Sequence, residues 1–208
     1  MFGKKSAEKS VTEVRLVEAA AQLFSRHGFK ATTTREIAQL ADLNEVTLFR
    51  NFPRKLDLFL AALESQLSRF NLGRELQASL SEGDDPEVVL PQVVTFVLNV
   101  LVMQPELQHL LYVAGFEVPE SDKMIREHLG AVFDLLCVYF KKSVEKQTIR
   151  DVDPVLATLG LLGIVAAHQS LRERFIHERP AQSEPEQAIA AYVGMYLHGL
   201  KTSPDFAR

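Results

Sequence analysis

The stretch from Thr32 to Lys55, TTTREIAQLADLNEVTLFRNFPRK, predicts two short helices joined by a tight turn near the N-terminus. Thr34 is a favourable N-cap for the first helix, and apolar side chains at helical spacing follow it. Asp42, Leu43 and Asn44 interrupt this spacing before a second helix begins. A turn of this kind sets two helices at a steep angle, so that the second can enter a major groove while the first crosses the DNA backbone. The stretch therefore predicts a DNA-reading helix-turn-helix.

The residues around this stretch extend the pattern in both directions. A helix is predicted from Val14 to His27, Gly28 and Phe29 follow it, and the second helix of the pair leads into the sequence Lys55-Leu56-Asp57-Leu58. With these motifs, the first quarter of the chain resembles the TetR/AcrR family of bacterial one-component transcriptional regulators. Two positions depart from the family pattern. Phe49 stands where members usually carry Tyr, and Val46 stands where a small residue or Pro is common.

Charge is distributed unevenly along the 208 residues, although the formal net charge is only −4. Residues 1–55 contain ten Lys and Arg against six Asp and Glu, a net charge of +4, which leaves 13 basic and 21 acidic residues, a net charge of −8, for the remainder. A basic head fits contact with phosphates, and an acidic body does not. We therefore expect a DNA-binding domain at residues 1–55, with a short basic N-terminal arm, and an effector-binding and dimerisation domain at 56–208.

The remainder of the chain predicts an all-α fold with about nine helices. One helix is expected from Pro53 to about Ser81, and Asp85-Pro86, Asp153-Pro154 and Glu184-Pro185 are favourable starts for later ones, because Pro suits the first helical position. The helix from Glu87 to Met103 is apolar almost all round, which is typical of a helix inside a bundle. No alternating strand pattern of useful length is found.

Motif searches give no support to an enzyme, a metal site or a cofactor. The sequence has no Gly-rich phosphate loop, no metal-spaced Cys/His cluster, no HExxH and no GxSxG. The single cysteine, Cys137, excludes an intramolecular disulfide, and the N-terminus lacks the apolar core of a signal peptide. The longest near-continuous apolar run, residues 155–167, is too short for a bilayer, which needs about 20 residues. We expect a cytoplasmic protein without cofactor or metal.

Contacts to DNA are assigned from side-chain chemistry and from the resemblance. Thr33 and Thr34 at a helix start suit phosphate, and Arg35 can reach a guanine edge through its paired donors. Val46 could meet a thymine methyl group, whereas Glu45 could accept from cytosine or deter wrong sequences. The complete predicted set is Thr33, Thr34, Arg35, Asn44, Glu45, Val46, Thr47, Phe49, Arg50, Asn51 and Lys55, of which Asn51 and Lys55 are expected to bind phosphate.

The resemblance implies that the body encloses an effector cavity, and ordinary core packing is the alternative for any single residue. Its expected walls are Phe96, Val100, Met103, His109, Tyr112, Phe116, Phe133, Cys137, Phe140 and His168. Polar groups in an apolar pocket orient a ligand, so His109, Tyr112, His128 and His168 are of particular interest.

The last two predicted helices, about Asp153 to Glu178 and Glu184 to Thr202, mix small residues with large ones. The resemblance places a homodimer interface here, and packing within one chain is the alternative. The predicted interface residues are Leu159, Gly160, Gly163, Ala167, Ala191, Gly194, Met195 and His198. A two-fold dimer presents two reading helices about 34 to 36 Å apart and so reads a near-palindrome.

Together these features predict a ligand-responsive, sequence-specific DNA-binding regulator, with repression as the usual family outcome. A small apolar or amphipathic effector would release it from its operator. A non-enzymatic small-molecule carrier and a non-specific DNA-coating protein remain as alternatives. The carrier would bind ligand without specific DNA affinity, and the coat would bind DNA without sequence preference and with a steep salt dependence.

Overall fold

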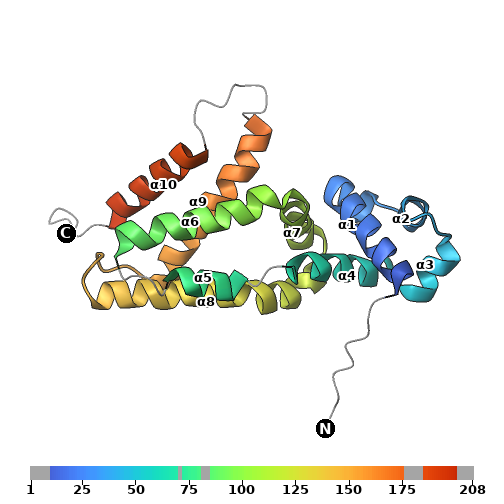
Figure 1. The fold of residues 1–208 in the computed structure, drawn as a ribbon, viewed down its shortest axis with the longest axis horizontal. Helices are drawn as coiled ribbons and strands as arrows, with labels where there is room; N and C mark the ends of the chain where they lie inside the picture. The colour runs from blue at the N-terminus through green and yellow to red at the C-terminus, as the bar shows by residue number, and fades with distance from the viewer. Residues whose placement is uncertain (1–9, 70–71, 81–84, 176–184, 201–208) are drawn as a thin grey trace, which may run out of the picture. The chain divides into compact units, whose positions relative to one another are not determined.

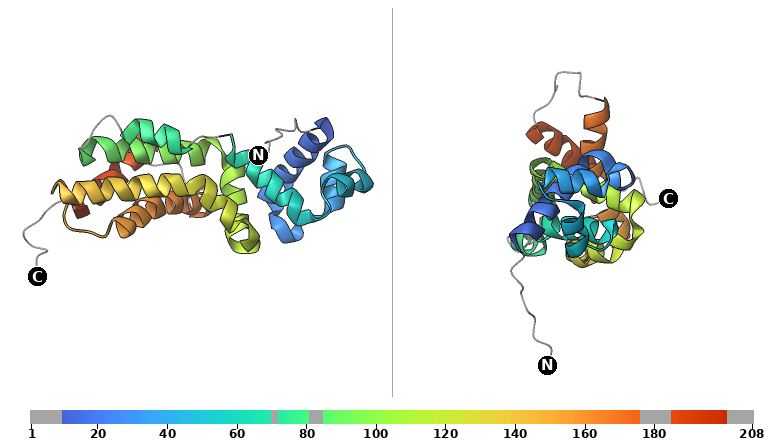
Figure 2. Two further views of the ribbon diagram at one scale, coloured as in Figure 1. Left: turned by 90° about the horizontal axis from the view of Figure 1, so that it is seen from below. Right: turned by 90° about the vertical axis from the view of Figure 1, so that its right-hand side faces the viewer.

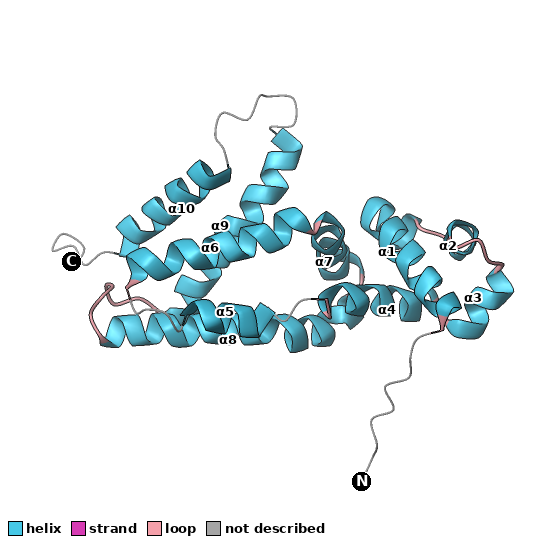
Figure 3. Ribbon diagram, in the orientation of Figure 1, coloured by secondary structure: helices cyan, strands magenta, loops and turns pink. Residues whose placement is uncertain are grey.

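The computed structural model describes residues 10–69, 72–80, 85–175 and 185–200, and helices dominate this part of the chain (Figures 1 and 3). No strand occurs among the described residues. The helices are α1 (Val11–Ala31), α2 (Thr34–Leu40), α3 (Glu45–Asn51), α4 (Lys55–Leu67), α5 (Leu72–Leu80), α6 (Pro86–Met103), α7 (Pro105–Glu117), the 3₁₀ helix η1 (Pro119–Ser121), α8 (Asp122–Glu145), α9 (Pro154–Phe175) and α10 (Pro185–Leu200). The all-α prediction is confirmed.

The described residues form ten α-helices where about nine were expected, because the predicted helix from Pro53 to Ser81 is two helices. α4 begins at Lys55 and ends at Leu67, where Ser68 caps it, and α5 begins at Leu72. The sequence prediction was wrong on this point, since residues on both sides of the break have helical spacing and no Pro or Gly stands directly after Leu67.

The chain divides into two compact units. The head unit comprises Met1–Phe70 with Pro105–Arg126, and the body unit comprises Asn71–Gln104 with Glu127–Arg208. The head unit therefore contains α4 and α7 in addition to the three N-terminal helices. The functional division at residues 55/56 stays a prediction.

Within the head unit, α1 packs against α2, α4 and α7 (Figures 1 and 2). Ser10 caps the start of α1 by accepting from Glu13 N at 3.2 Å. Phe24, Phe29 and Phe59 form a cluster with ring centroids 5.2 to 5.7 Å apart, in stacked and edge-on geometries that favour aromatic pairs. These rings hold the end of α1 to α4.

The body unit has a continuous apolar core to which α5, α6, α8, α9 and α10 contribute. α6 begins behind Asp85, whose carboxylate accepts from Glu87 N at 3.0 Å, and α9 begins behind Asp153, which accepts from Val155 N at 2.7 Å. The buried members of this core are Leu76, Val89, Leu90, Val93, Val94, Leu98, Val132, Leu136, Tyr139, Phe140, Ile149, Ala157, Leu161, Val165, Val193 and Leu200. Searched over its described residues, the chain has no helix with the length and apolar character needed to cross a membrane.

Candidate nucleic-acid interface

The helix α3 presents a two-sided surface that suits groove reading. Leu48 is fully buried and anchors the helix, whereas Val46 is 79% exposed and Phe49 is 45% exposed. Arg50 is exposed on the last turn of the same helix, and Arg35 is exposed on α2. The structure thus places three predicted DNA-contacting side chains, Arg35, Val46 and Arg50, at the surface, while Leu48 fixes α3 to the core.

Caps fix the ends of the helix pair. Thr33, not Thr34, is the N-cap of α2, so the sequence prediction was one residue late. Glu36 N donates to the Thr33 hydroxyl at 3.2 Å, and Thr33 N donates to the Glu36 carboxylate at 2.9 Å, which completes a capping box. The spacing Thr-x-x-Glu was visible in the sequence and could have placed the cap. Asn44 caps α3 by accepting from Thr47 N at 2.8 Å.

Hydrogen bonds from Thr33 also favour the ionised form of Glu36. The backbone N–H of Thr33 and its hydroxyl both donate to the Glu36 carboxylate, and they lower the pKa of Glu36 below its ordinary value of 4.5. Because both donors stabilise the ionised carboxylate, the cap is complete only while Glu36 is charged. The start of α2 is therefore held by an ionised side chain at neutral pH.

A side-chain hydrogen bond joins the starts of the two helices. The Thr34 hydroxyl donates to Glu45 Oε1 at 2.9 Å, and this contact is partly buried. Thr34 was predicted to bind phosphate and Glu45 to face the bases, and both assignments stay predictions. The bond gives each residue a structural task as well, since it fixes α3 against α2.

Two further residues predicted to bind phosphate also have partners inside the protein. Lys55 Nζ donates to the carbonyl oxygens of Phe29 at 2.8 Å and Thr32 at 3.0 Å, and Asn51 Nδ2 donates to Thr47 O at 2.7 Å. Lys55 is half-buried, so its ammonium joins α4 to the turn between α1 and α2. Their phosphate contacts stay predictions.

Ion pairs support the rim of the helix pair. Arg15 Nη2 on α1 lies 3.1 Å from Asp42 Oδ2 in the turn, where Asp42 has a φ of 52°. Arg54 donates to both carboxylate oxygens of Asp57, which lowers the pKa of Asp57 and raises that of Arg54. The charge of Arg54 is thus partly neutralised by Asp57.

Comparison with known proteins places these features in a family. The family model described as bacterial regulatory proteins, tetR family, matches residues 16–62, which contain the whole helix-turn-helix. The HTH-type transcriptional regulator YvkB of Bacillus subtilis is 30% identical over 139 residues, covering 67% of this chain and 71% of YvkB. The chain belongs to the TetR family. It is therefore a TetR-family transcriptional regulator, as the sequence predicted.

A second curated relative of this TetR-family regulator matches over a shorter segment than YvkB. The HTH-type transcriptional repressor NicS of Pseudomonas putida is 29% identical over 110 residues, which span 52% of this chain and 50% of NicS. Among solved structures, the fatty acid degradation regulator FadR of Bacillus halodurans superimposes with a TM-score of 0.69 at 19% identity, covering 94% of this chain and 100% of FadR. AibR in complex with isovaleryl coenzyme A and operator DNA superimposes with a TM-score of 0.68 at 18% identity, covering 88% and 97%. These structures share the fold.

The predicted effector residues of this TetR-family regulator lie in both units. His109, Tyr112 and Phe116 lie on α7 of the head unit, and Phe116 is 84% exposed. In the body unit, Phe140 is fully buried in the core, Phe96 packs against that core, and Phe133 is half-buried on α8. Cys137 Sγ lies 3.4 Å from Thr158 Oγ1. The side chains of Val100, Met103 and His168 are outside the described residues.

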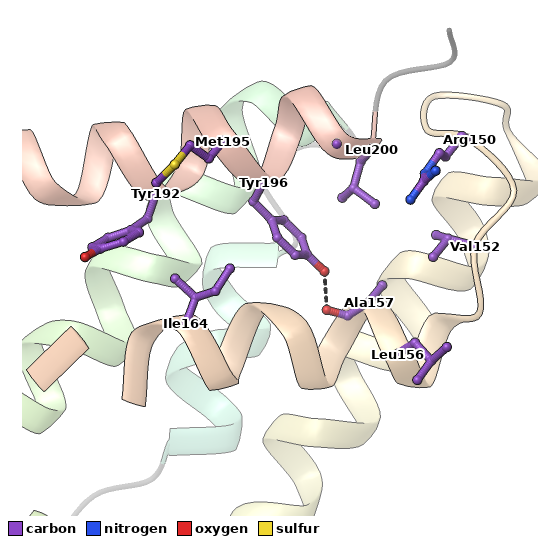
Figure 4. Close-up of a pocket in the computed structure, with 10 residues that line it drawn as sticks. Arg150, Val152, Leu156, Ala157, Ile164, Tyr192, Met195, Tyr196 and Leu200 are labelled. Carbon is purple, nitrogen blue, oxygen red and sulfur yellow. Dashed lines mark hydrogen bonds between the residues drawn. The ribbon is translucent and has the colours of Figure 1, made fainter. Parts of the chain in front are cut away.

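The body unit contains a pocket that sequence reasoning missed. It has a volume of about 520 Å³ and lies between α9, α10 and the segment before α9 (Figure 4). The Tyr196 hydroxyl donates to Ala157 O across it, and burial raises the pKa of Tyr196 to about 12. Its lining residues are Arg150, Val152, Leu156, Ala157, Ile164, Tyr192, Met195, Tyr196, Gly199 and Leu200. None of the predicted effector residues is among them. The pocket is formed where α9 and α10 pack together, and local sequence patterns do not predict such a contact.

The helices α9 and α10 also expose an apolar surface. Leu156 is 65% exposed, Leu159 53% and Met195 63%, and a Cβ added at Gly163 or Gly194 would meet no atom within 4 Å. Ala167, Ala191 and His198 are exposed as well. Gly160 differs from these positions, since a Cβ there would approach the Tyr196 ring of the same chain to 3.3 Å. Seven of the eight predicted interface residues are therefore exposed to solvent, whereas Gly160 packs against Tyr196 of the same chain.

Among the residues that the structure describes, no group of three or more His, Cys, Asp or Glu side chains could hold a metal ion.

Proposed function

We propose that this TetR-family regulator is a homodimeric repressor that binds a near-palindromic operator and is released by a small apolar or amphipathic effector. The observation that carries the proposal is the surface formed by Arg35, Val46 and Arg50, which is exposed on helices that are capped and anchored internally. A reading head needs such exposed side chains on a rigid support, because base recognition requires fixed geometry.

Within this proposal, α3 reads the major groove. Val46 meets a thymine methyl group, and Arg35 donates both of its paired N–H groups to a guanine edge. Thr33, at the exposed N-cap of α2, lies beside a phosphate, and Arg50 contributes charge near the backbone. Asn44 caps the start of α3 by accepting from Thr47 N. These two residues therefore take part in DNA contact at the N-terminus of the reading helix.

The dimer is formed through α9 and α10. Isolated exposed apolar residues are ordinary, but here Leu156, Leu159 and Met195 accompany Gly163 and Gly194, which leave room for a partner helix. A two-fold axis through this surface would give a self-complementary interface and two reading helices. Such a dimer accounts for near-palindromic recognition in the cytoplasm.

Acyl-coenzyme A compounds are the effector class to test first. AibR was crystallised with isovaleryl coenzyme A and operator DNA, and FadR of Bacillus subtilis, with a TM-score of 0.68 at 15% identity, was crystallised with stearoyl-CoA. The effector must bind the DNA-free and DNA-bound states with different affinity, since equal affinity would shift nothing.

The test is selection of bound duplexes from a random DNA pool at near-physiological salt, followed by sequencing. We expect an enriched near-palindrome whose affinity falls when isovaleryl-CoA or stearoyl-CoA is added. Val46→Ala should change the preferred base at one position in each half-site. The exposed Val138→Ala on α8 is the matched control and should select the wild-type sequence. Binding without sequence preference would favour the DNA-coating alternative, and acyl-CoA binding without specific DNA affinity would favour the carrier.

A further inference from the structure

A kink interrupts α1 three residues before its end. Gly28 has φ 83° and ψ 170°, a conformation that a residue with a side chain rarely adopts, while the residues on both sides remain helical. The short turn behind Gly28 therefore begins like a new helix, and the first backbone N–H groups of a helix need acceptors from outside it. Gly28 itself has no side chain with which to cap that start.

Glu117, at the last position of α7, supplies the missing cap. Lys30 N donates to Glu117 Oε2 at 2.8 Å, across 87 residues of sequence. A Cβ added at Gly28 would lie only 2.7 Å from Glu117 Oε1. The carboxylate thus occupies the space that a side chain at position 28 would fill. Both residues belong to the head unit.

The capped turn is also held from other sides. The Thr32 hydroxyl donates to Gly28 O at 2.8 Å, and Lys55 Nζ donates to Phe29 O and Thr32 O. The next residue, Thr33, is the N-cap of α2. A displacement of the turn would therefore move the start of the helix pair that presents Arg35 and Val46.

We infer that Glu117 is a positioning residue for DNA reading: its carboxylate caps the kink of α1 and makes the position of α2 depend on α7. α7 belongs to the head unit, and only Gln104 separates it in sequence from α6 of the body unit. A change in the position of α6 could therefore be passed along the chain to α7. When α7 withdraws Glu117, the Lys30 amide loses its partner and the turn loosens. This inference rests on the proposed function, because it assigns a role within operator binding.

The experiment compares Glu117→Ala with Glu117→Gln. Both variants remove the same charge from the head, but the Gln side chain keeps an oxygen that can accept from Lys30 N. Affinities are measured for the selected operator duplex and for a random duplex of equal length, together with the melting temperature and NMR hydrogen exchange at the Lys30 amide. Glu106→Ala, which removes an exposed carboxylate from the first turn of α7, is the control.

We expect Glu117→Ala to lower the ratio of operator to random affinity about 3- to 10-fold relative to Glu117→Gln and to accelerate exchange at Lys30. Glu117→Gln and Glu106→Ala should keep both values within about twofold of wild type. Equal ratios and equal Lys30 exchange in the Ala and Gln variants would overturn the inference. If wild-type protein selected no duplex, the proposed function would fail, and unchanged Lys30 exchange in Glu117→Ala would independently overturn the cap.

A double-variant cycle tests the contact itself. Gly28→Ala should lower the melting temperature, both because φ is positive and because its Cβ approaches Glu117. In the Glu117→Ala background the second cause disappears, so the drop caused by Gly28→Ala should be smaller. Equal drops in both backgrounds would show that Glu117 does not occupy this space and would overturn the inference.

Discussion

Lys55 makes two separate contacts with Phe29. Its ammonium nitrogen lies 2.8 Å from the Phe29 carbonyl oxygen and 4.5 Å from the centre of the Phe29 ring. The first contact satisfies a carbonyl at the end of α1, and the second places a cation over an aromatic face. The same ring packs on Phe24 and Phe59, so Lys55 closes the cluster that joins α1 to α4.

The first prediction follows from this contact. Lys55→Met keeps the apolar stem but removes the ammonium, so we expect the free energy of unfolding to fall by about 1–2 kcal/mol. Urea unfolding measures the change. Lys142→Met, at an exposed position on α8, should change stability by less than about 0.5 kcal/mol. If Lys55→Met kept wild-type stability and instead flattened the salt dependence of DNA binding, Lys55 would be a phosphate contact.

The helix-turn-helix could be predicted from the sequence because its determinants are local. Asn44 caps the helix that begins one residue later, and Leu48 faces the core at the expected spacing. Such signals act within one helical turn. The shift of the α2 cap from Thr34 to Thr33 arose between two adjacent threonines, of which only Thr33 has Glu36 at the distance of a capping box.

The packing of α7 on α1 could not be predicted in this way. Glu117 and Lys30 are 87 residues apart, and no sequence motif links the two positions. The pocket beside Tyr196 has the same origin, since Tyr196 reaches Ala157 across 39 residues. Periodicity predicts which side of a helix is buried, but it does not specify which helix covers it.

The second prediction concerns acid stability. The pKa of Glu36 is lower in the folded chain than its ordinary 4.5 because Thr33 donates to the ionised carboxylate. Its contribution to stability is therefore fully present above about pH 4.5 and is lost as the pH falls through the folded value. We expect the melting temperature of Glu36→Gln to fall less than that of wild type on acidification below pH 4.5. Glu18→Gln, an exposed substitution on α1, is the control. Parallel curves for Glu36→Gln and wild type would contradict the role of the cap.

The third prediction concerns a buried amide on α7. Gln108 is 3% exposed, and neither Oε1 nor Nε2 has a hydrogen-bond partner among the described residues. Burial of an amide without partners is costly, so Gln108→Met, which has similar length, should raise the free energy of unfolding by about 1–2 kcal/mol. Denaturant unfolding measures the gain. Gln92→Met, at an exposed position on α6, should give little change, and a loss of stability in Gln108→Met would show that the amide is satisfied in solution.

The fourth prediction tests the proposed dimer. Leu159→Glu places a charge in the exposed apolar surface of α9, which a partner would bury, and an unpaired buried charge is strongly unfavourable. Sedimentation should show a shift from dimer to monomer together with loss of near-palindromic binding. Val138→Glu introduces the same charge at a 51% exposed position on α8 and should leave the dimer intact. A dimeric Leu159→Glu variant would place the interface elsewhere.

The fifth prediction separates base reading from backbone contact. Arg35 is exposed on α2, whereas the Arg54 guanidinium is held by both oxygens of Asp57. Arg35→Ala should therefore cost about 1–3 kcal/mol on the selected operator and relax the preference at one base pair, while its affinity for random DNA changes less. Arg54→Ala should affect operator and random duplexes alike, because its charge is already shared with Asp57. Competition binding with operators substituted one base pair at a time would measure both effects. Equal losses for Arg35→Ala on operator and random DNA would assign Arg35 to the phosphate backbone, since only a base contact distinguishes one sequence from another.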